Sequence, residues 1–230
     1  MQVVGSFDIH ATKYFTALSP QPSGQTIVAD METMCCECLK NFKEKTGSIC
    51  RRIVVYRSDV GEGSRNRLLN VELMAMKRAW RSLYPDEAEE VKITLIVVIM
   101  HHHVRIYPQG RTADRSGNVP TGTLVDGDIT NAHDTDFFLV SQPGLRGTSR
   151  PTHYNVLYED NGLTLARIEI MTFDLCHVYS RASRAISQPA PSFYAHLAAF
   201  RCRYYVHQGD DGNFRVAPLN DRLRSVMFYG

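Results

Sequence analysis

The sequence lacks any apolar run long enough to cross a bilayer. Its longest run, Ile93–Met100, is interrupted by Thr94 and is far shorter than the roughly 20 residues that a membrane helix needs. The opening residues MQVVGSFDIH contain neither a basic segment nor a long apolar stretch, so they do not match a signal peptide. Both absences predict a protein with no membrane partner.

Paired cysteine motifs are also lacking. Of the six cysteines only Cys35 and Cys38 have the C-x-x-C spacing, and no second pair follows at the distance that a zinc site requires. Cys35, Cys36 and Cys38 fall in a helical pattern, where we interpret them as packing thiols. Unpaired, buried thiols are typical of a reducing compartment, so the sequence predicts a cytoplasmic location.

Lysine is scarce, because 6 of the 26 basic residues are lysine and 20 are arginine. A formal net charge of +2 does not by itself predict a nucleic-acid partner. Arginine, however, offers a planar, bidentate fork that suits phosphate, whereas lysine is a point charge. Composition alone therefore leaves two explanations open, phosphate binding and biased codon usage.

The order of the predicted elements indicates an α/β fold. Strands are predicted from patterns of apolar residues at Met1–Phe7, Lys13–Leu18, Arg52–Tyr56, Ile93–Met100, Asp136–Ser141 and His153–Tyr158. Helical periodicity covers Gly24–Lys45 and Asn66–Leu83. Two further helices are predicted, one after an N-capping Thr164 and a last one that starts near Ser192, with Phe193, Leu197, Phe200 and Tyr204 on its apolar face.

Four longer motifs occupy the second half of the chain. They are Ser116–Pro120 (SGNVP), Gly147–Tyr154 (GTSRPTHY), Leu175–Arg181 (LCHVYSR) and Ser187–Arg201 (SQPAPSFYAHLAAFR). In this order they resemble motifs of the Piwi domain of Argonaute proteins, whose corresponding forms include GTSRPxHY and SxPAPxYYAHLxAFR. The final MFYG also resembles the MYFA-type ending of that family, and the likeness covers nearly the whole chain.

The resemblance implies a fold similar to that of ribonuclease H, a mixed central sheet flanked by helices. It implies that residues 1–207 form a Piwi domain that is truncated at its N-terminus, with the first strand missing. Residues 208–230 are then expected to form a C-terminal tail tucked against that domain.

The resemblance also implies where catalytic residues should lie. Eukaryotic members of the family cleave a target strand with Asp, Glu, Asp and His, which hold Mg²⁺ or Mn²⁺. The first Asp belongs to the strand that this chain lacks, and Thr26 and Ser58 stand at the next two positions. Only His196 matches. Asp59, one place beyond Ser58, is the other candidate metal ligand, although a one-residue shift turns a strand side chain to the opposite face; alternatively, Asp59 or Glu62 faces the N-terminus of the following helix.

The positions that contact a guide strand are better preserved. By resemblance, the nucleic-acid-binding residues are Arg150, Tyr179, Arg181, Ser187, Arg201 and Tyr204. On the last helix, His196 and Arg201 should lie about 140° apart, on opposite flanks, at about 100° per residue. For His101–His103 we expect nucleic-acid contact or packing at a strand end rather than a metal site, because alternate strand residues face opposite ways.

These observations predict a module that binds a small guide RNA and its complementary target RNA in RNA-mediated gene silencing, without cleavage by this chain. One alternative is an active, metal-dependent endoribonuclease in the full-length protein. A second alternative is an interaction module, because family members bind tryptophan-containing silencing partner proteins in pockets on this domain.

Overall fold

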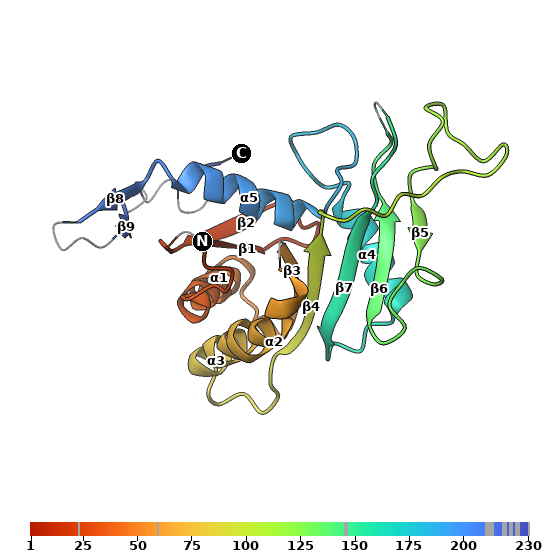
Figure 1. Ribbon diagram of the computed structural model, residues 1–230. Coiled ribbons are helices and arrows are strands. Elements are labelled where there is room, and N and C mark those ends of the chain that lie inside the picture. The colour runs from red at the N-terminus through yellow and green to blue at the C-terminus, as the bar shows by residue number, and fades with distance from the viewer. Residues whose placement is uncertain are drawn as a thin grey trace. The chain divides into compact units, whose positions relative to one another are not determined.

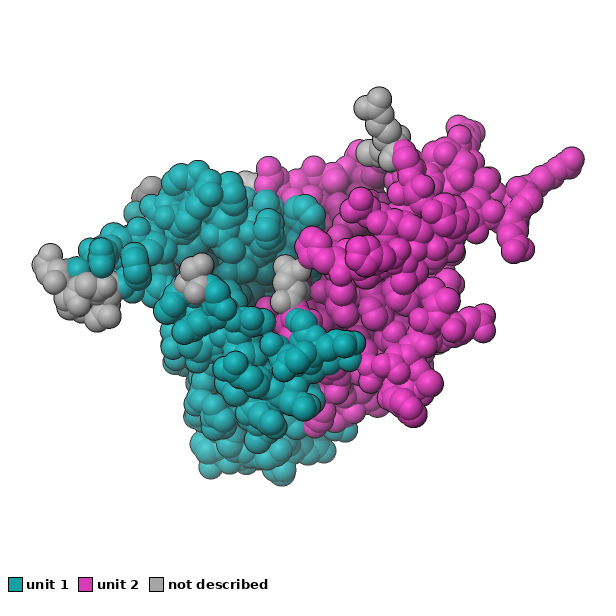
Figure 2. All heavy atoms as spheres, in the orientation of Figure 1, with its two compact units in different colours: residues 1–53, 61–92, 191–230 teal, residues 54–60, 93–190 magenta. Residues whose placement is uncertain are grey.

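The computed structural model describes residues 1–22, 24–58, 60–144, 147–209, 214–217, 220, 223 and 226–229. The chain forms two compact units, shown in different colours in Figure 2. Unit 1 comprises residues 1–53, 61–92 and 191–230, and unit 2 comprises residues 54–60 and 93–190.

Unit 1 begins with an antiparallel hairpin of β1 (Gln2–Ser6) and β2 (Tyr14–Leu18). The Asp8 carboxylate closes the connection, because it accepts hydrogen bonds from the backbone N–H groups of Thr12 at 3.0 Å and Lys13 at 2.8 Å. Such a bond from an aspartate to the backbone a few residues later stabilises a tight turn. Both strands of this hairpin confirm the prediction from the sequence.

Helix α1 (Met31–Thr46) lies beside α3 (Met74–Leu83) in unit 1 (Figure 1). The buried residues Met31, Met34, Cys35 and Leu39 follow the i, i+3, i+4, i+8 pattern of one face of an amphipathic helix. The helix ends at Gly47, whose φ of 71° allows its N–H to reach the Lys43 carbonyl at 2.8 Å.

The predicted start of this helix at Gly24 is wrong, because residues 24–30 form a loop before α1. The Gln21 amide explains the difference. Its Nε2 donates to the carbonyls of Gln25 and Ile27 at 2.9 Å each, and its Oε1 accepts from the Ala29 N–H at 3.2 Å. A side chain that satisfies backbone groups in this way competes with the helical hydrogen bonds.

The predicted helix over Asn66–Leu83 is present, but it is not regular. A short η1 (Glu62–Ser64) and α2 (Arg65–Arg67) lead into a π-helical segment, η2 (Leu68–Leu73), before α3. The wider turn changes which residues face inward. It brings Glu72 to 1% exposure, where its Oε1 accepts a hydrogen bond from Val28 N at 2.8 Å.

Helix α5 (Ala190–Cys202) was predicted near its observed start, but the predicted buried face is wrong. Tyr194, Ala198 and Cys202 are buried, whereas Phe200 and Tyr204 are 54% and 65% exposed. Small residues allow a close approach of the helix, and the Tyr194 ring then packs 5.0 Å from Tyr14 and 6.1 Å from Tyr229. A short hairpin of β8 (Val206–Gln208) and β9 (Phe214–Val216) follows, which the sequence did not predict.

Unit 2 is built on a five-stranded sheet in the order β3-β4-β7-β6-β5 (Figure 1). The strands are β3 (Arg52–Ser58), β4 (Lys92–Ile99), β5 (Thr123–Val125), β6 (Thr135–Val140) and β7 (Thr152–Glu159). The pairs β4–β7, β7–β6 and β6–β5 are antiparallel, and β3 reaches β4 through a helical crossover, as parallel neighbours require. Every predicted strand is confirmed, and β5 is a further strand that was not predicted from the sequence.

The core of unit 2 lies between the sheet and α4 (Leu165–Leu175). Ile96, Val98 and Tyr154 from the sheet meet Ile168 from the helix, each at 1% exposure or less. The predicted Thr164 cap is confirmed, because its hydroxyl accepts a hydrogen bond from Arg167 N at 3.3 Å.

All six cysteines are free thiols, and Cys35, Cys176 and Cys202 are buried. Burial raises the pKa of Cys35 to about 12 and that of Cys176 to about 11. These values favour the neutral thiol, which supports the interpretation of Cys35 as a packing residue. Within the described part of the chain, no helix combines the length and apolar character needed to cross a membrane.

Candidate nucleic-acid interface and catalytic positions

Arg150 lies at the end of the loop that leads into β7. Its side chain is exposed, and it forms no ion pair with a described residue. The backbone on both sides of it is nevertheless fixed. Asn118 Oδ1 accepts a hydrogen bond from Ser149 N at 2.8 Å, and His102 Nε2 bonds to the Pro151 carbonyl at 2.9 Å. An exposed guanidinium such as that of Arg150, on a backbone held in place, is suited to binding an anionic ligand through charge-assisted hydrogen bonds.

His102 belongs to a cluster of rings on the sheet of unit 2. Its ring packs edge-on against Phe138, with centroids 5.4 Å apart, and Phe138 stacks on His153 at 4.3 Å. His153 Nε2 in turn lies 2.6 Å from Asp136 Oδ2. Burial lowers the pKa of His102, which favours its neutral ring. His102 therefore packs, which is one of the two roles expected for His101–His103, and these residues lie just beyond β4 rather than in it.

The segment after α4 holds three more predicted nucleic-acid-binding residues: Tyr179, Arg181 and Ser187. Tyr179 is buried at 8% exposure, whereas Arg181 is exposed. Two side chains hold the end of the segment, since Ser141 Oγ donates to the Ile186 carbonyl at 2.6 Å and Thr152 Oγ1 donates to the Ser187 carbonyl. Helix α4 ends at Leu175, so Arg181 lies in irregular structure.

Unit 1 carries the other predicted positions on and after α5. Arg201 is exposed, with its guanidinium 5.9 Å from the Tyr204 ring centroid and 6.0 Å from that of Tyr205. Arg203, which the sequence analysis missed, stacks 3.7 Å from the Phe200 ring. The i, i+3 spacing of Phe200 and Arg203 was the available signal, although Arg203 lies one residue beyond the end of α5. Exposed arginines on aromatic rings present both charge and flat surface.

Fewer of the predicted catalytic residues than of the predicted nucleic-acid-binding residues can be placed in the structure. His196 is exposed on α5, and Asp59 lies outside the described residues. Thr26 is exposed in the loop before α1, and Ser58 is the last residue of β3. Glu62 is in the first turn of η1, where an acid complements the partial positive charge of the helix end.

A metal site therefore does not follow from the side chains that are described. No three His, Cys, Asp or Glu side chains come together there in a group that could hold an ion. Thr26 and Ser58, which the resemblance aligns with two acidic positions, carry neutral hydroxyls. Mg²⁺ and Mn²⁺ prefer carboxylate oxygens, so the donors among the described residues do not fit either ion.

The sheet order and the flanking helices define an α/β domain of the ribonuclease H type. The Piwi domain family model matches residues 1–207, so the chain belongs to the Piwi domain family.

Solved structures agree with this assignment. The chain is similar to the C-terminal lobe of a budding yeast Argonaute, with a TM-score of 0.89 and 26% identity over 98% of this chain and 49% of that one. It is similar to Kluyveromyces polysporus Argonaute, which was solved with a guide RNA, with a TM-score of 0.88 and 26% identity over 98% of this chain and 28% of that one. For Drosophila Piwi the TM-score is 0.77 and the identity 25%, over 98% and 29%. The chain thus spans half or less of the length of each.

Proposed function

We propose that this chain binds the sugar–phosphate backbone of a small guide RNA within an Argonaute-type protein, for RNA-mediated gene silencing in the cytoplasm. Base pairing between this guide and a complementary target RNA would then select the target. The observation that carries the proposal is Arg150, an exposed guanidinium whose flanking backbone is fixed by Asn118 and His102. The similarity of the chain to an Argonaute that was solved with a guide RNA supports the choice of RNA as the ligand.

Each unit contributes its own phosphate contacts in this proposal. Arg150 and Arg181 are exposed in unit 2, and Arg201 is exposed in unit 1. Contacts to phosphate position a strand without reading its bases, so binding should be general with respect to sequence. Each arginine that neutralises a phosphate releases a counterion, so that binding should weaken as the salt concentration rises.

The test is the affinity for a 5′-phosphorylated single-stranded RNA over a range of salt concentrations. Three arginine contacts predict a slope of log K against log salt near −2, or roughly a 20-fold loss of affinity between 50 and 200 mM salt. Arg150→Ala, Arg181→Ala and Arg201→Ala should each flatten the slope by about 0.7. Arg167→Ala, which removes an exposed arginine of α4, is the charge-matched control. A flat salt response, or a strong preference among guide sequences of equal length, contradicts the proposal.

We further propose that this chain does not cleave the target. The support is the set of residues at the catalytic positions, where hydroxyls replace two carboxylates and His196 alone matches. The chain is incubated with a guide–target duplex in Mg²⁺ or Mn²⁺. Metal-dependent cuts that disappear in His196→Ala would instead support the alternative of an active endoribonuclease.

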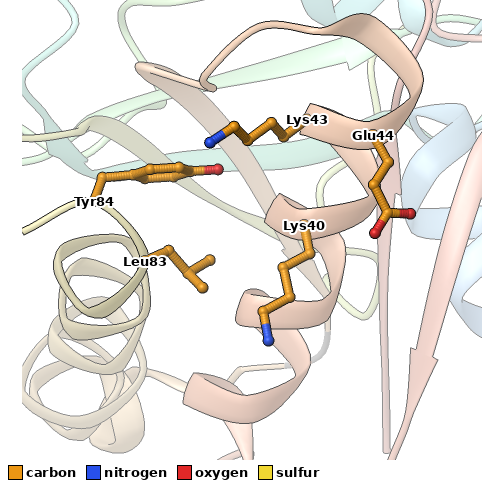
Figure 3. Close-up of a pocket in the computed structure, with 5 residues that line it drawn as sticks. All are labelled: Lys40, Lys43, Glu44, Leu83 and Tyr84. Atoms are coloured by element: carbon orange, nitrogen blue, oxygen red, sulfur yellow. The ribbon is translucent and has the colours of Figure 1, made fainter.

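A pocket in unit 1 favours a second candidate function, the binding of a partner peptide. It has a volume of about 310 Å³ and is lined by Lys40, Lys43, Glu44, Leu83 and Tyr84 (Figure 3). The Lys43 ammonium lies 5.1 Å from the Tyr84 ring centroid, and Leu83 adds apolar surface. Because Tyr84 is only 6% exposed, a tryptophan ring would contact chiefly the apolar Leu83 and the Lys43 cation.

Calorimetric titration with a tryptophan-containing peptide and its Trp→Ala counterpart tests this candidate. Binding should require the tryptophan and should weaken in Lys43→Glu, but not in Lys45→Glu, a matched charge reversal outside the pocket lining. Equal binding of the two peptides would rule out this use of the pocket.

A further inference from the structure

The Asn118 side chain joins two loops of unit 2. It is 5% exposed, and its amide uses both of its ends. Oδ1 accepts from Ser149 N at 2.8 Å, while Nδ2 donates to the Gly147 carbonyl at 2.9 Å and to Ser116 Oγ at 3.0 Å. An amide supplies an acceptor and two donors in one plane, so only this orientation satisfies all three partners.

Asn118 is itself held in place by the turn that carries it. The Asp114 carboxylate accepts from Ser116 N at 2.8 Å, Ser116 Oγ at 2.6 Å and Asn118 N at 3.0 Å. Asp114 N also donates to the Asn118 carbonyl at 2.7 Å. Gly117 makes the turn possible, because its φ of 78° lies in the left-handed region that favours glycine. The turn is thus formed by its own residues before it meets residues 147–149.

The contact between the two loops is tight. A Cβ atom added at Gly144 would lie 2.5 Å from Asn118 Nδ2 and 2.6 Å from Ser149 Oγ. Both distances are shorter than real contacts of that kind, so a side chain at position 144 would displace Asn118 or Ser149. The bare backbone of Gly144 therefore packs directly against these two side chains.

We infer that Asn118 is a positioning residue for Arg150. By fixing the backbone of Gly147 and Ser149 it sets the direction in which the next side chain leaves the chain, and the His102 bond to Pro151 does the same from the other side. A guanidinium held in its binding direction loses less conformational entropy when it meets phosphate. This inference rests on the proposed function, in which Arg150 contacts the guide backbone.

A double-mutant cycle tests the inference with 5′-phosphorylated single-stranded RNA as the probe. Asn118→Ala should lower the affinity by about fivefold to tenfold and flatten the salt slope by about 0.7, as Arg150→Ala does, because the same phosphate contact is lost. The double variant should bind no more weakly than Arg150→Ala alone. Asn131→Ala is the matched control, since this exposed amide bonds within its own turn, donating to Asp134 Oδ2 and accepting from His133 N at 3.2 Å each.

The outcomes separate the inference from the proposed function. An unchanged slope in Arg150→Ala defeats the proposed function. A flattened slope in Arg150→Ala with an unchanged slope in Asn118→Ala, or simple additivity of the two losses, overturns the inference. If Asn118→Ala does not fold, Asp114→Ala replaces it, because this change frees the turn without touching residues 147–149. It should flatten the slope and speed hydrogen exchange at the Ser149 amide, and no change in either overturns the inference.

Discussion

Loss of two buried hydroxyls is expected to loosen the segment that ends at Ser187. Ser141 Oγ donates to the Ile186 carbonyl at 2.6 Å, and Thr152 Oγ1 donates to the Ser187 carbonyl. Ser141 and Thr152 are 2% and 1% exposed, so water has little access to replace either hydroxyl. A buried acceptor left unpaired costs about 1–3 kcal/mol. Ser141→Ala and Thr152→Val, which change side-chain volume little, should each lower the free energy of unfolding by about that amount.

Two measurements check this prediction. For a chain of this size, 1 kcal/mol corresponds to a shift of about 2–4 °C in Tm, so each variant should melt several degrees earlier. The Ile186 amide donates to the Cys176 carbonyl at 2.9 Å, so its hydrogen exchange reports on the opening of this segment. Exchange at Ile186 should become faster in both variants. The two losses should also couple by at least about 0.5 kcal/mol, because the bonds hold consecutive residues.

Thr152→Ser is the control, because it keeps the hydroxyl and removes only a methyl group, worth about 0.8 kcal/mol. It should leave exchange at Ile186 close to that of the parent protein. The reasoning is refuted if both hydroxyl deletions cost under about 0.5 kcal/mol, the range of ordinary surface substitutions, and exchange at Ile186 does not change.

Three further predictions concern pH and association. Burial, and secondly the nearby Asp126 carboxylate, raise the pKa of Glu169 above 4.5, so ionisation of Glu169 opposes folding as the pH rises. In urea unfolding, Glu169→Gln should therefore be more stable than the parent protein at pH 7 and no more stable than it below about pH 4. Burial lowers the pKa of His102 below 6.5, so stability should fall as pH drops through 6.5, and His102→Gln should remove that part of the decline. The edge strand β3 turns Val54 and Tyr56 toward the core of unit 2, which leaves Val55 on its other face. A lysine on an edge strand disfavours its pairing with another chain, so Val55→Lys should reduce association, measured as light scattering at equal concentration. Unchanged scattering would mean that this edge does not drive association.

The local hydrophobic pattern predicted most of the elements but not all their faces. The eight-residue β4 and the hairpin of β1 and β2 are long or well punctuated, so the period of their apolar residues is clear. The face of helix α5 was predicted wrongly, because Phe200 is larger and more apolar than Ala198, yet the small residue lies inside. Burial there is decided by how closely the helix can approach its neighbours, which periodicity alone does not show.

The candidate site could be predicted only in part. Sequence motifs name the residues that could contact a ligand, whereas the residues that hold them in position are distant in the sequence. The exposed arginines at 150, 181 and 201 could be named from the sequence. Asn118 could not be assigned a role, since its partner Ser149 is 31 residues away and the contact exists only after the chain has folded. The loop before α1 was not predicted for the same reason, because the hydrogen bonds of the Gln21 side chain to the backbone of Gln25 and Ile27 exist only in the folded chain.

Holding a strand and cutting it place different demands on the same fold. Cleavage by two metal ions needs several carboxylates aimed at one point, so a hydroxyl in place of an acid, as the resemblance implies for Thr26 and Ser58, removes negative charge from such a site. Binding a phosphate backbone is a sum over separate contacts, each of which survives the loss of another. What it requires is that each arginine leaves the surface in a fixed direction, which the bonds of Asn118 and His102 provide around Arg150. In the proposed function, two substitutions are enough to remove cutting, whereas guide binding depends on the buried Asn118 amide and the half-buried His102 imidazole, which fix the backbone around Arg150.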